Sequence, residues 1–145
     1  MLNIFKSKKL KDFVRFYFPV LIWMGIIFYL SSIPSLKSGA SVIFVEIILR
    51  KIAHLMEYAI LAFLIFRIFF INKQCLFLKS LLISLLIIFL YSVGDEVHQL
   101  FVEDRAGKII DVGIDLIGGI IGLLIAKLII YRNFSRKNHI SSLNK

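Results

Sequence analysis

The sequence predicts an all-α fold in which four membrane-spanning helices form a single domain over residues 1–145. Hydrophobic residues make up 59% of the chain and the mean hydropathy is +0.89, which is more apolar than a typical soluble domain. The apolar residues gather in four long runs, and about 20 such residues allow a helix to cross a bilayer. The connections between the runs leave no room for a soluble domain. The spans are expected at 16–32, 52–71, 76–94 and 109–131.

The first run follows a group of lysines, an arrangement that resembles the start of a secretory signal peptide. The apolar stretch is long for a signal, and no clear small-residue cleavage site follows it, so we expect a retained first helix. The segment 33–50 begins with turn-forming residues around Pro34 and becomes apolar from Val42 onward. Two interpretations stay open for this segment, an interfacial helix or an extension of the second span.

The charge pattern predicts the orientation of the helices. Four spans place both termini on one side of the membrane, and that side carries most of the 18 Lys and Arg residues. By the positive-inside rule we expect both termini in the cytoplasm of a bacterium, with the chain in its cytoplasmic membrane. The net charge of +9 does not indicate nucleic-acid binding, because the basic residues flank apolar spans and form no stripe on a soluble face. The single cysteine, Cys75, excludes an intramolecular disulfide.

Polar side chains are concentrated at the outer end of the second, third and fourth spans. Residues three and four apart share one face of a helix, so each span presents its polar groups on one side. A carboxylate at membrane depth costs about 2–3 kcal/mol or more, and these groups are therefore expected to face the bundle interior. There they would form an outward-facing pocket, which Arg105 enters from the connecting loop. The polar groups are His54 and Glu57, then Asp95, His98 and Gln99, then Asp111 and Asp115.

Small residues continue the polar face of the fourth span toward its other end. They are Gly118, Gly119, Gly122 and Ala126. Small residues at this spacing allow two membrane helices to approach closely, so we predict a packing seam here and not a phosphate-binding loop. The seam also turns both aspartates of this span toward the bundle interior.

The residue types predict what such a pocket can do. A histidine beside carboxylates can act as a general base toward water or a lipid hydroxyl. Arg and Lys side chains bind phosphate or carboxylate, so the expected partner is a membrane lipid or a lipid-linked wall precursor. The catalytic candidates are His54, Glu57, Asp95, Asp111 and Asp115, and the candidates for substrate binding are Lys51, Gln99 and Arg105.

A divalent metal such as Zn²⁺ or Mn²⁺ is a further candidate cofactor, since the pocket combines histidines with carboxylates. The spacings match no standard metal signature, such as two histidines four apart on one helix. The candidate ligands are His54, Glu57, Asp95, His98 and Asp111.

Two strings of the chain resemble the VanZ-like family of small bacterial membrane proteins. They are KIAHLMEYAILAFLIFR, from Lys51 to Arg67, and YSVGDEVHQLFVEDRAGKIIDVGIDLIGG, from Tyr91 to Gly119. The matching positions are Ser31, Ser32, Lys51, His54, Glu57, Tyr58, Asp95, Glu96, Gln99, Phe101, Arg105 and Asp111. The founding member of this family is associated with resistance to teicoplanin, a glycopeptide antibiotic with a fatty acyl tail. The resemblance therefore implies a role in the cell envelope and leaves the reaction open.

The loop before Arg105 departs from the family pattern. The family commonly has Pro-Gly-Arg, whereas this chain has Glu103-Asp104-Arg105, so we expect the arginine to be kept and the tight turn to be lost. The polar residues around the loop are expected to be solvated. They are Glu96, Glu103, Asp104 and Lys108.

Three alternatives to an enzyme stay open. The charges could form a purely structural network, in which Arg50, Lys51 and Arg105 neutralise the carboxylates and hold the helices together. The pocket could instead bind or shield an acylated antibiotic, a lipid or a wall-synthesis partner without chemistry. A transporter ranks last, because four spans are few and the acids lie at one end of the bundle and not at its midplane.

Overall fold

The computed structural model describes residues 2–34, 40–105 and 107–143, and all regular structure in these ranges is helical. The first helical segment is continuous, because a π-helical turn at Phe13–Tyr17 joins α1 to α2. A second π-helical turn, Ile68–Asn72, ends the helix that contains α3. The α-helices are α1 (Leu2–Asp12), α2 (Phe18–Ser31), α3 (Ala40–Arg67), α4 (Phe77–Gln99) and α5 (Ile109–Leu143).

Four helical segments are long and apolar enough to cross a membrane. They are Ser7–Ser31, Phe44–Asn72, Phe77–Gln99 and Ile109–Ile130. The prediction of an all-α protein with four membrane helices is therefore confirmed. The third span extends to Gln99 and not to 94, so the polar residues from Asp95 onward belong to α4 and not to the loop.

Within the segment 33–50, residues 40–50 extend the second span, which is one of the two interpretations left open by the sequence. Helix α3 begins at Ala40 and continues without interruption to Arg67, and residues 35–39 lie outside the described part of the chain. The predicted start at 52 was too late because three charged residues interrupt the apolar pattern. They are Glu46, Arg50 and Lys51, and all three lie on the helix.

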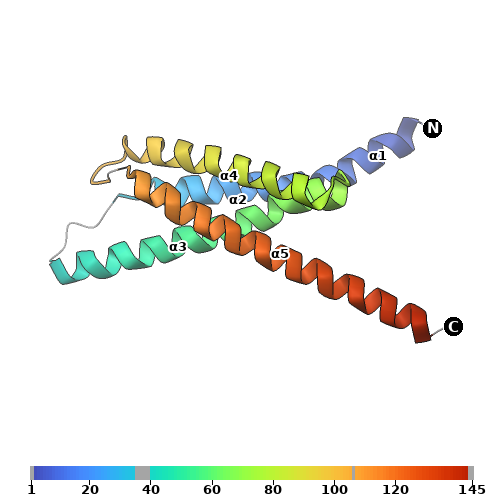
Figure 1. Cartoon of the computed structure of the whole chain (residues 1–145). Helices are drawn as coiled ribbons and strands as arrows, with labels where there is room; N and C mark the ends of the chain where they lie inside the picture. Colours follow the sequence, from blue (N-terminus) through green and yellow to red (C-terminus); the bar gives the residue numbers. More distant parts are fainter. Residues whose placement is uncertain (1, 35–39, 106, 144–145) are drawn as a thin grey trace.

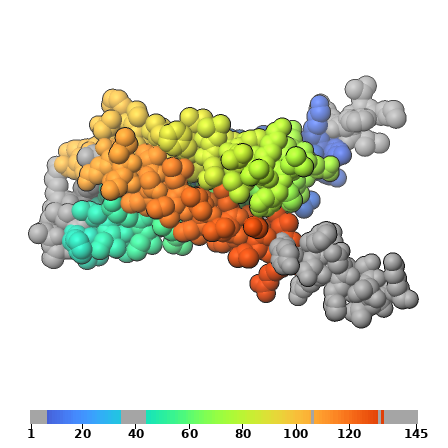
Figure 2. Space-filling view, viewed as in Figure 1, coloured from blue at the N-terminus to red at the C-terminus, as the bar shows by residue number. Residues whose placement is uncertain are grey.

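Figure 1 shows α2 and α4 running side by side, while α3 and α5 cross each other beneath them. The start of α1 and the end of α5 lie at the same end of the bundle, opposite to the loop between α4 and α5. In the space-filling view α5 covers the middle of this face, between α3 and α4 (Figure 2). The beginning of α3 points away from the other helices. It lies at the end of the bundle that also holds the end of α2 and the α4–α5 loop (Figure 1).

The predicted small-residue seam on α5 is confirmed. A Cβ atom added to Gly118 would overlap the backbone carbonyl of Leu55, and one added to Gly122 would overlap that of Ala59. Only hydrogen at these two positions allows the backbones of α5 and α3 to approach so closely. The contact fixes the rotation of α5, and thereby turns Asp115 toward the neighbouring helices.

Candidate functional site

Asp115 joins three helices at the centre of the polar cluster. Its side chain is fully buried, and its Oδ1 lies 3.2 Å from Nδ1 of His54 on α3. Its Oδ2 accepts a hydrogen bond of 2.5 Å from the Ser92 hydroxyl on α4. A carboxylate that accepts from two neighbouring helices fixes the orientation of the histidine ring.

Asp95 on α4 is the centre of a second group of buried hydrogen bonds. Its Oδ2 accepts hydrogen bonds from the Ser31 hydroxyl at the end of α2, at 2.9 Å, and from the Gln99 amide, at 3.2 Å. Gln99 was predicted to bind substrate, but its amide nitrogen is directed to Asp95. The other carboxyl oxygen of Asp95, Oδ1, is buried and has no hydrogen-bond partner among the described residues.

Lys51 and Asp111 form an ion pair on the more exposed side of the cluster. Lys51 Nζ lies 2.9 Å from Asp111 Oδ1, and the two side chains are 40% and 25% exposed. Pairs exposed to this degree contribute at most about 1 kcal/mol in water. The pair connects the beginning of α5 to α3. Neither residue takes part in the buried hydrogen bonds around Asp115.

Arg105 reaches from the α4–α5 loop to the end of α2. Its Nε and Nη2 atoms donate to the backbone carbonyls of Ile33 and Leu30, each at 2.9 Å, and thereby hold the loop against the end of α2. The third donor, Nη1, is buried without a partner among the described residues. Burial and the neighbouring Arg50 lower the pKa of Arg105.

The predicted ion-pair network is present only in part. Arg50 pairs with Glu46 on its own helix, and Arg105 donates to carbonyl groups. None of the Lys or Arg side chains that the structure describes forms an ion pair with Glu57 or Asp95. Neutralisation by arginine therefore does not explain these two buried carboxyls.

The prediction that Glu96 is a solvated loop residue is wrong. Glu96 lies on α4, is buried, and accepts the backbone N–H of Lys108 on Oε2 at 2.7 Å. The chain returns across the end of α4 here, and a Cβ atom at Gly107 would overlap the Glu96 carbonyl. Glu103, Asp104 and Lys108 are exposed, as predicted.

The turn before Arg105 is retained, contrary to expectation. Asp104 has a φ of 57°, which is the left-handed conformation that favours glycine and that Asp adopts more readily than most other residues. Asp104 therefore supplies the backbone conformation that the Pro-Gly-Arg pattern led us to expect only from a glycine.

Replacement of Glu96 by alanine is expected to loosen the loop that carries Arg105. The Lys108 amide loses the carboxylate that accepts its hydrogen bond, so its hydrogen exchange should accelerate by at least about tenfold, in line with the free energy of a charge-assisted hydrogen bond. Hydrogen–deuterium exchange of the purified protein measures this directly. The control is Glu103→Ala, which removes an exposed carboxylate from the same loop. Equal exchange in both variants would show that Glu96 does not hold the loop.

His98 lies apart from His54. Its Nε2 is 2.9 Å from the Ser32 hydroxyl, and its ring stacks on Phe28 with 4.2 Å between the ring centroids. The structure places no three His, Cys, Asp or Glu side chains of its described residues where they could share a metal ion. The candidate metal ligands named from the sequence are thus divided among separate contacts.

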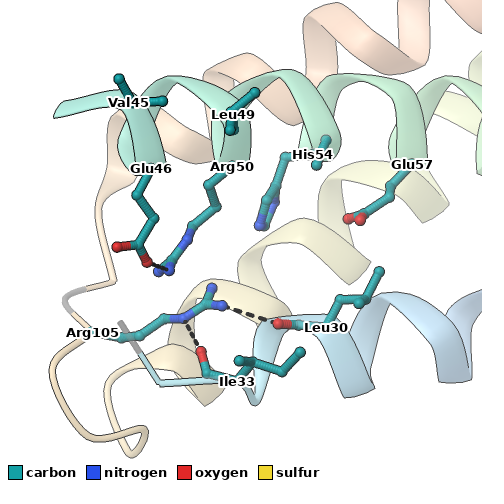
Figure 3. A pocket seen from close by; sticks show the side chains of 10 residues that line it. Leu30, Ile33, Val45, Glu46, Leu49, Arg50, His54, Glu57 and Arg105 are labelled. Carbon is teal, nitrogen blue, oxygen red and sulfur yellow. Dashed lines mark hydrogen bonds and ion pairs between the residues drawn. The ribbon is translucent and has the colours of Figure 1, made fainter. Parts of the chain in front are cut away.

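A cavity of about 740 Å³ opens between the beginning of α3, the end of α2 and the α4–α5 loop. Three predicted site residues line it, His54, Glu57 and Arg105. Figure 3 shows His54 and Glu57 pointing from α3 into the space that faces Arg105. The remaining wall was not identified from the sequence. It consists of Leu30, Ile33, Val45, Glu46, Leu49, Arg50 and Ala53.

The other residues predicted to act in catalysis or substrate binding do not line the cavity. Asp115 orients His54, and Asp95 and Gln99 are joined to the end of α2 through Ser31. The hydroxyls of Ser31 and Ser92 are the polar partners that we did not predict. Ser92 could have been found from its spacing, because it precedes Asp95 by one helical turn.

Comparison with known proteins supports the family indicated by the sequence motifs. No curated protein and no solved structure matches the chain. A family model described as VanZ/LLP1 matches residues 16–131, which include most of the first membrane-spanning segment, the other three in full, the cavity residues and the buried aspartates. The chain therefore belongs to the VanZ/LLP1 family.

Proposed function

We propose that the cavity opens on the outer side of a bacterial cytoplasmic membrane and modifies a lipid or lipid-linked wall precursor of the outer leaflet, thereby lowering susceptibility to teicoplanin. The observation that carries this proposal is the His54–Asp115 pair at the wall of the cavity. The excess of Lys and Arg on the side of the termini supports the orientation.

The pair has the arrangement of a general base and the residue that orients it. In this arrangement Nδ1–H of His54 donates a hydrogen bond to Asp115, which leaves Nε2 as the basic nitrogen. Nε2 has no hydrogen-bond partner among the described residues, and the residue borders the cavity. There it can take a proton from water or a lipid hydroxyl as the oxygen attacks phosphorus or a carbonyl carbon, and return the proton to the leaving alcohol.

The walls of the cavity suit an amphiphile. Leu30, Ile33, Val45, Leu49 and Ala53 provide an apolar surface for acyl chains. Arg105 Nη1 is a buried, unused donor at the same cavity, and it can bind the phosphate or carboxylate of a headgroup. A lipid could therefore place its acyl chains on the apolar wall and its headgroup at Arg105.

Replacement of His54 by alanine is expected to abolish protection, because no other histidine in the described part of the chain borders the cavity. The measurement is teicoplanin susceptibility of a bacterial host that expresses each variant at the same membrane level. His98→Ala is the matched control, since it removes an imidazole at the same end of the bundle but outside the cavity wall. We expect the His98 variant to protect as the wild type does. Full protection by the His54 variant would refute a role for the pair.

A second candidate function is binding or shielding without chemistry, and the mostly apolar wall of the cavity favours it. Such a protein should protect in proportion to its amount and leave the membrane composition unchanged. An enzyme should leave an altered lipid or precursor that requires His54. Mass spectrometry of membrane lipids from cells with wild-type protein or His54→Ala separates the two functions.

A further inference from the structure

Two buried polar atoms at the cavity have no partner among the described residues, and they have opposite character. Arg105 Nη1 is a cationic donor, and Glu57 Oε2 is a carboxyl oxygen. Both residues line the same cavity, and Figure 3 shows His54 pointing into the space between α3 and Arg105. Buried polar groups are nearly always hydrogen-bonded to protein, water or ligand. A ligand that satisfies both atoms needs an acceptor for Arg105 Nη1 and a donor for Glu57 Oε2.

The Arg105 side of the cavity favours an anion. Arg105 and Arg50 both line it, and Arg50 is close enough to affect the guanidinium of Arg105. Glu46 neutralises part of this charge through its ion pair with Arg50. Two of the Arg105 N–H groups donate to carbonyls at the end of α2, so the guanidinium is fixed. Nη1, the nitrogen without a partner among the described residues, is left for a phosphate or carboxylate oxygen.

The Glu57 side favours a cation that carries N–H groups. Glu57 is 8% exposed and Asp95 is 4% exposed, and each has one carboxyl oxygen without a partner among the described residues. No described Lys or Arg side chain pairs with either of them. Buried carboxyls without a cationic partner are strongly unfavourable, and an ammonium group from a ligand would supply both the charge and the hydrogen bonds.

We infer that the cavity takes a lipid headgroup that carries both an anion and a primary ammonium group, with the anion at Arg105 and the ammonium at Glu57. The inference rests on the proposed function, in which the cavity binds a lipid. Arg50, which lies near Arg105, and Glu57 are separated by two turns of α3, about 10 Å along its axis. A phosphate and an ammonium joined by a short linker, as in phosphoethanolamine, match this arrangement. A quaternary ammonium lacks the N–H that Glu57 Oε2 requires.

The test compares lipids that differ only in the headgroup. Purified protein in detergent is titrated with phosphatidylethanolamine, phosphatidylglycerol and phosphatidylcholine of identical acyl chains, and bound lipid is counted by native mass spectrometry. Phosphatidylethanolamine is expected to bind at least about tenfold more tightly than the other two, the effect of a charge-assisted hydrogen bond. Glu57→Gln should remove this preference, so that phosphatidylethanolamine binds no more tightly than phosphatidylglycerol. Glu103→Gln, which removes an exposed carboxylate, should keep the preference.

The outcomes separate this inference from the proposed function. Equal binding of the three lipids by the wild type overturns the headgroup assignment and leaves a lipid-binding cavity intact. A preference that persists in Glu57→Gln overturns the assignment of the ammonium to Glu57. Binding of no lipid overturns the proposed function as well. Free phosphoethanolamine is the last arm, and competition as strong as that of the intact lipid would support the headgroup assignment while refuting a lipid as the ligand. The comparison of lipids on the wild type needs no variant to fold.

Discussion

Replacement of Gly122 by alanine is expected to separate α5 from α3 and to lower the free energy of unfolding by about 3 kcal/mol. The added methyl group would overlap the backbone carbonyl of Ala59. A backbone atom in the middle of a helix cannot turn aside as a flexible side chain does, so the two helices have to move apart. This movement would also draw Asp115 away from His54, because both contacts lie on the same pair of helices.

The matched control is Gly113→Ala on the same helix. A Cβ atom at Gly113 meets nothing within 4 Å, and alanine is favoured over glycine in a helix interior by about 1 kcal/mol. We therefore expect the control to be as stable as the wild type or slightly more stable. The measurement is thermal unfolding in detergent, followed by size-exclusion chromatography of the heated samples. A Gly122 variant that melts with the control would show that α3 and α5 do not depend on this contact.

Replacement of Asp115 by asparagine is expected to reduce the rate of the proposed reaction by about 10²- to 10⁴-fold, the usual contribution of general-base catalysis. Asparagine preserves the shape of the side chain, and its carbonyl can still accept from Ser92. Its NH₂ group would face Nδ1 of His54 and donate to it, which places the ring proton on Nε2. The nitrogen that faces the cavity would then no longer be a base.

The comparison variant for this experiment is Asp111→Asn. Asp111 pairs with the half-exposed Lys51 and does not line the cavity, so the variant should change the rate by less than about fivefold. Both proteins are expressed at matched membrane levels, and the altered lipid and teicoplanin protection are measured together. Equal losses in the two variants would show that the carboxylates act as a group and that Asp115 has no special relation to His54.

The sequence was sufficient for the parts of the fold that depend on hydrophobic runs and small residues. Four spans were recognised because each run is long enough to cross a bilayer. The inward rotation of Asp115 was recognised because Gly118 and Gly122 share its helical face. Both inferences rely on contacts within one helix or between two helix faces, which periodicity describes well.

The errors concern groups whose partners are distant in the sequence. Glu96 was assigned to the loop, yet its partner is the backbone of Lys108 after the chain has turned back. The contacts of Arg105 with the end of α2 were also not foreseen, although two of its donors reach carbonyls there. Spacing along one helix cannot predict such contacts, because they depend on how the ends of different helices meet.

The sequence predicted a pocket but not its apolar wall, because that wall looks like ordinary membrane helix. Val45 and Leu49 lie on the extension of α3 that was not recognised because charged residues interrupt its apolar pattern. Leu30 and Ile33 come from the end of α2. These residues line a cavity because the beginning of α3 and the end of α2 are spaced apart (Figure 3).

The unusual length of α3 bears on the bilayer around the protein. Its span Phe44–Asn72 has 29 residues, against 23 for Phe77–Gln99, and is therefore about 9 Å longer at the usual rise of a helix. Two neighbouring helices of unequal hydrophobic length cannot both match one hydrocarbon thickness, so α3 tilts or the lipid beside it thickens. Glu46 and Arg50 line the cavity and lie near the beginning of this longer span. The acyl-chain length of the host membrane would therefore set how deep in the bilayer the entrance to the cavity lies. In cells with shorter lipids the entrance would lie closer to the water.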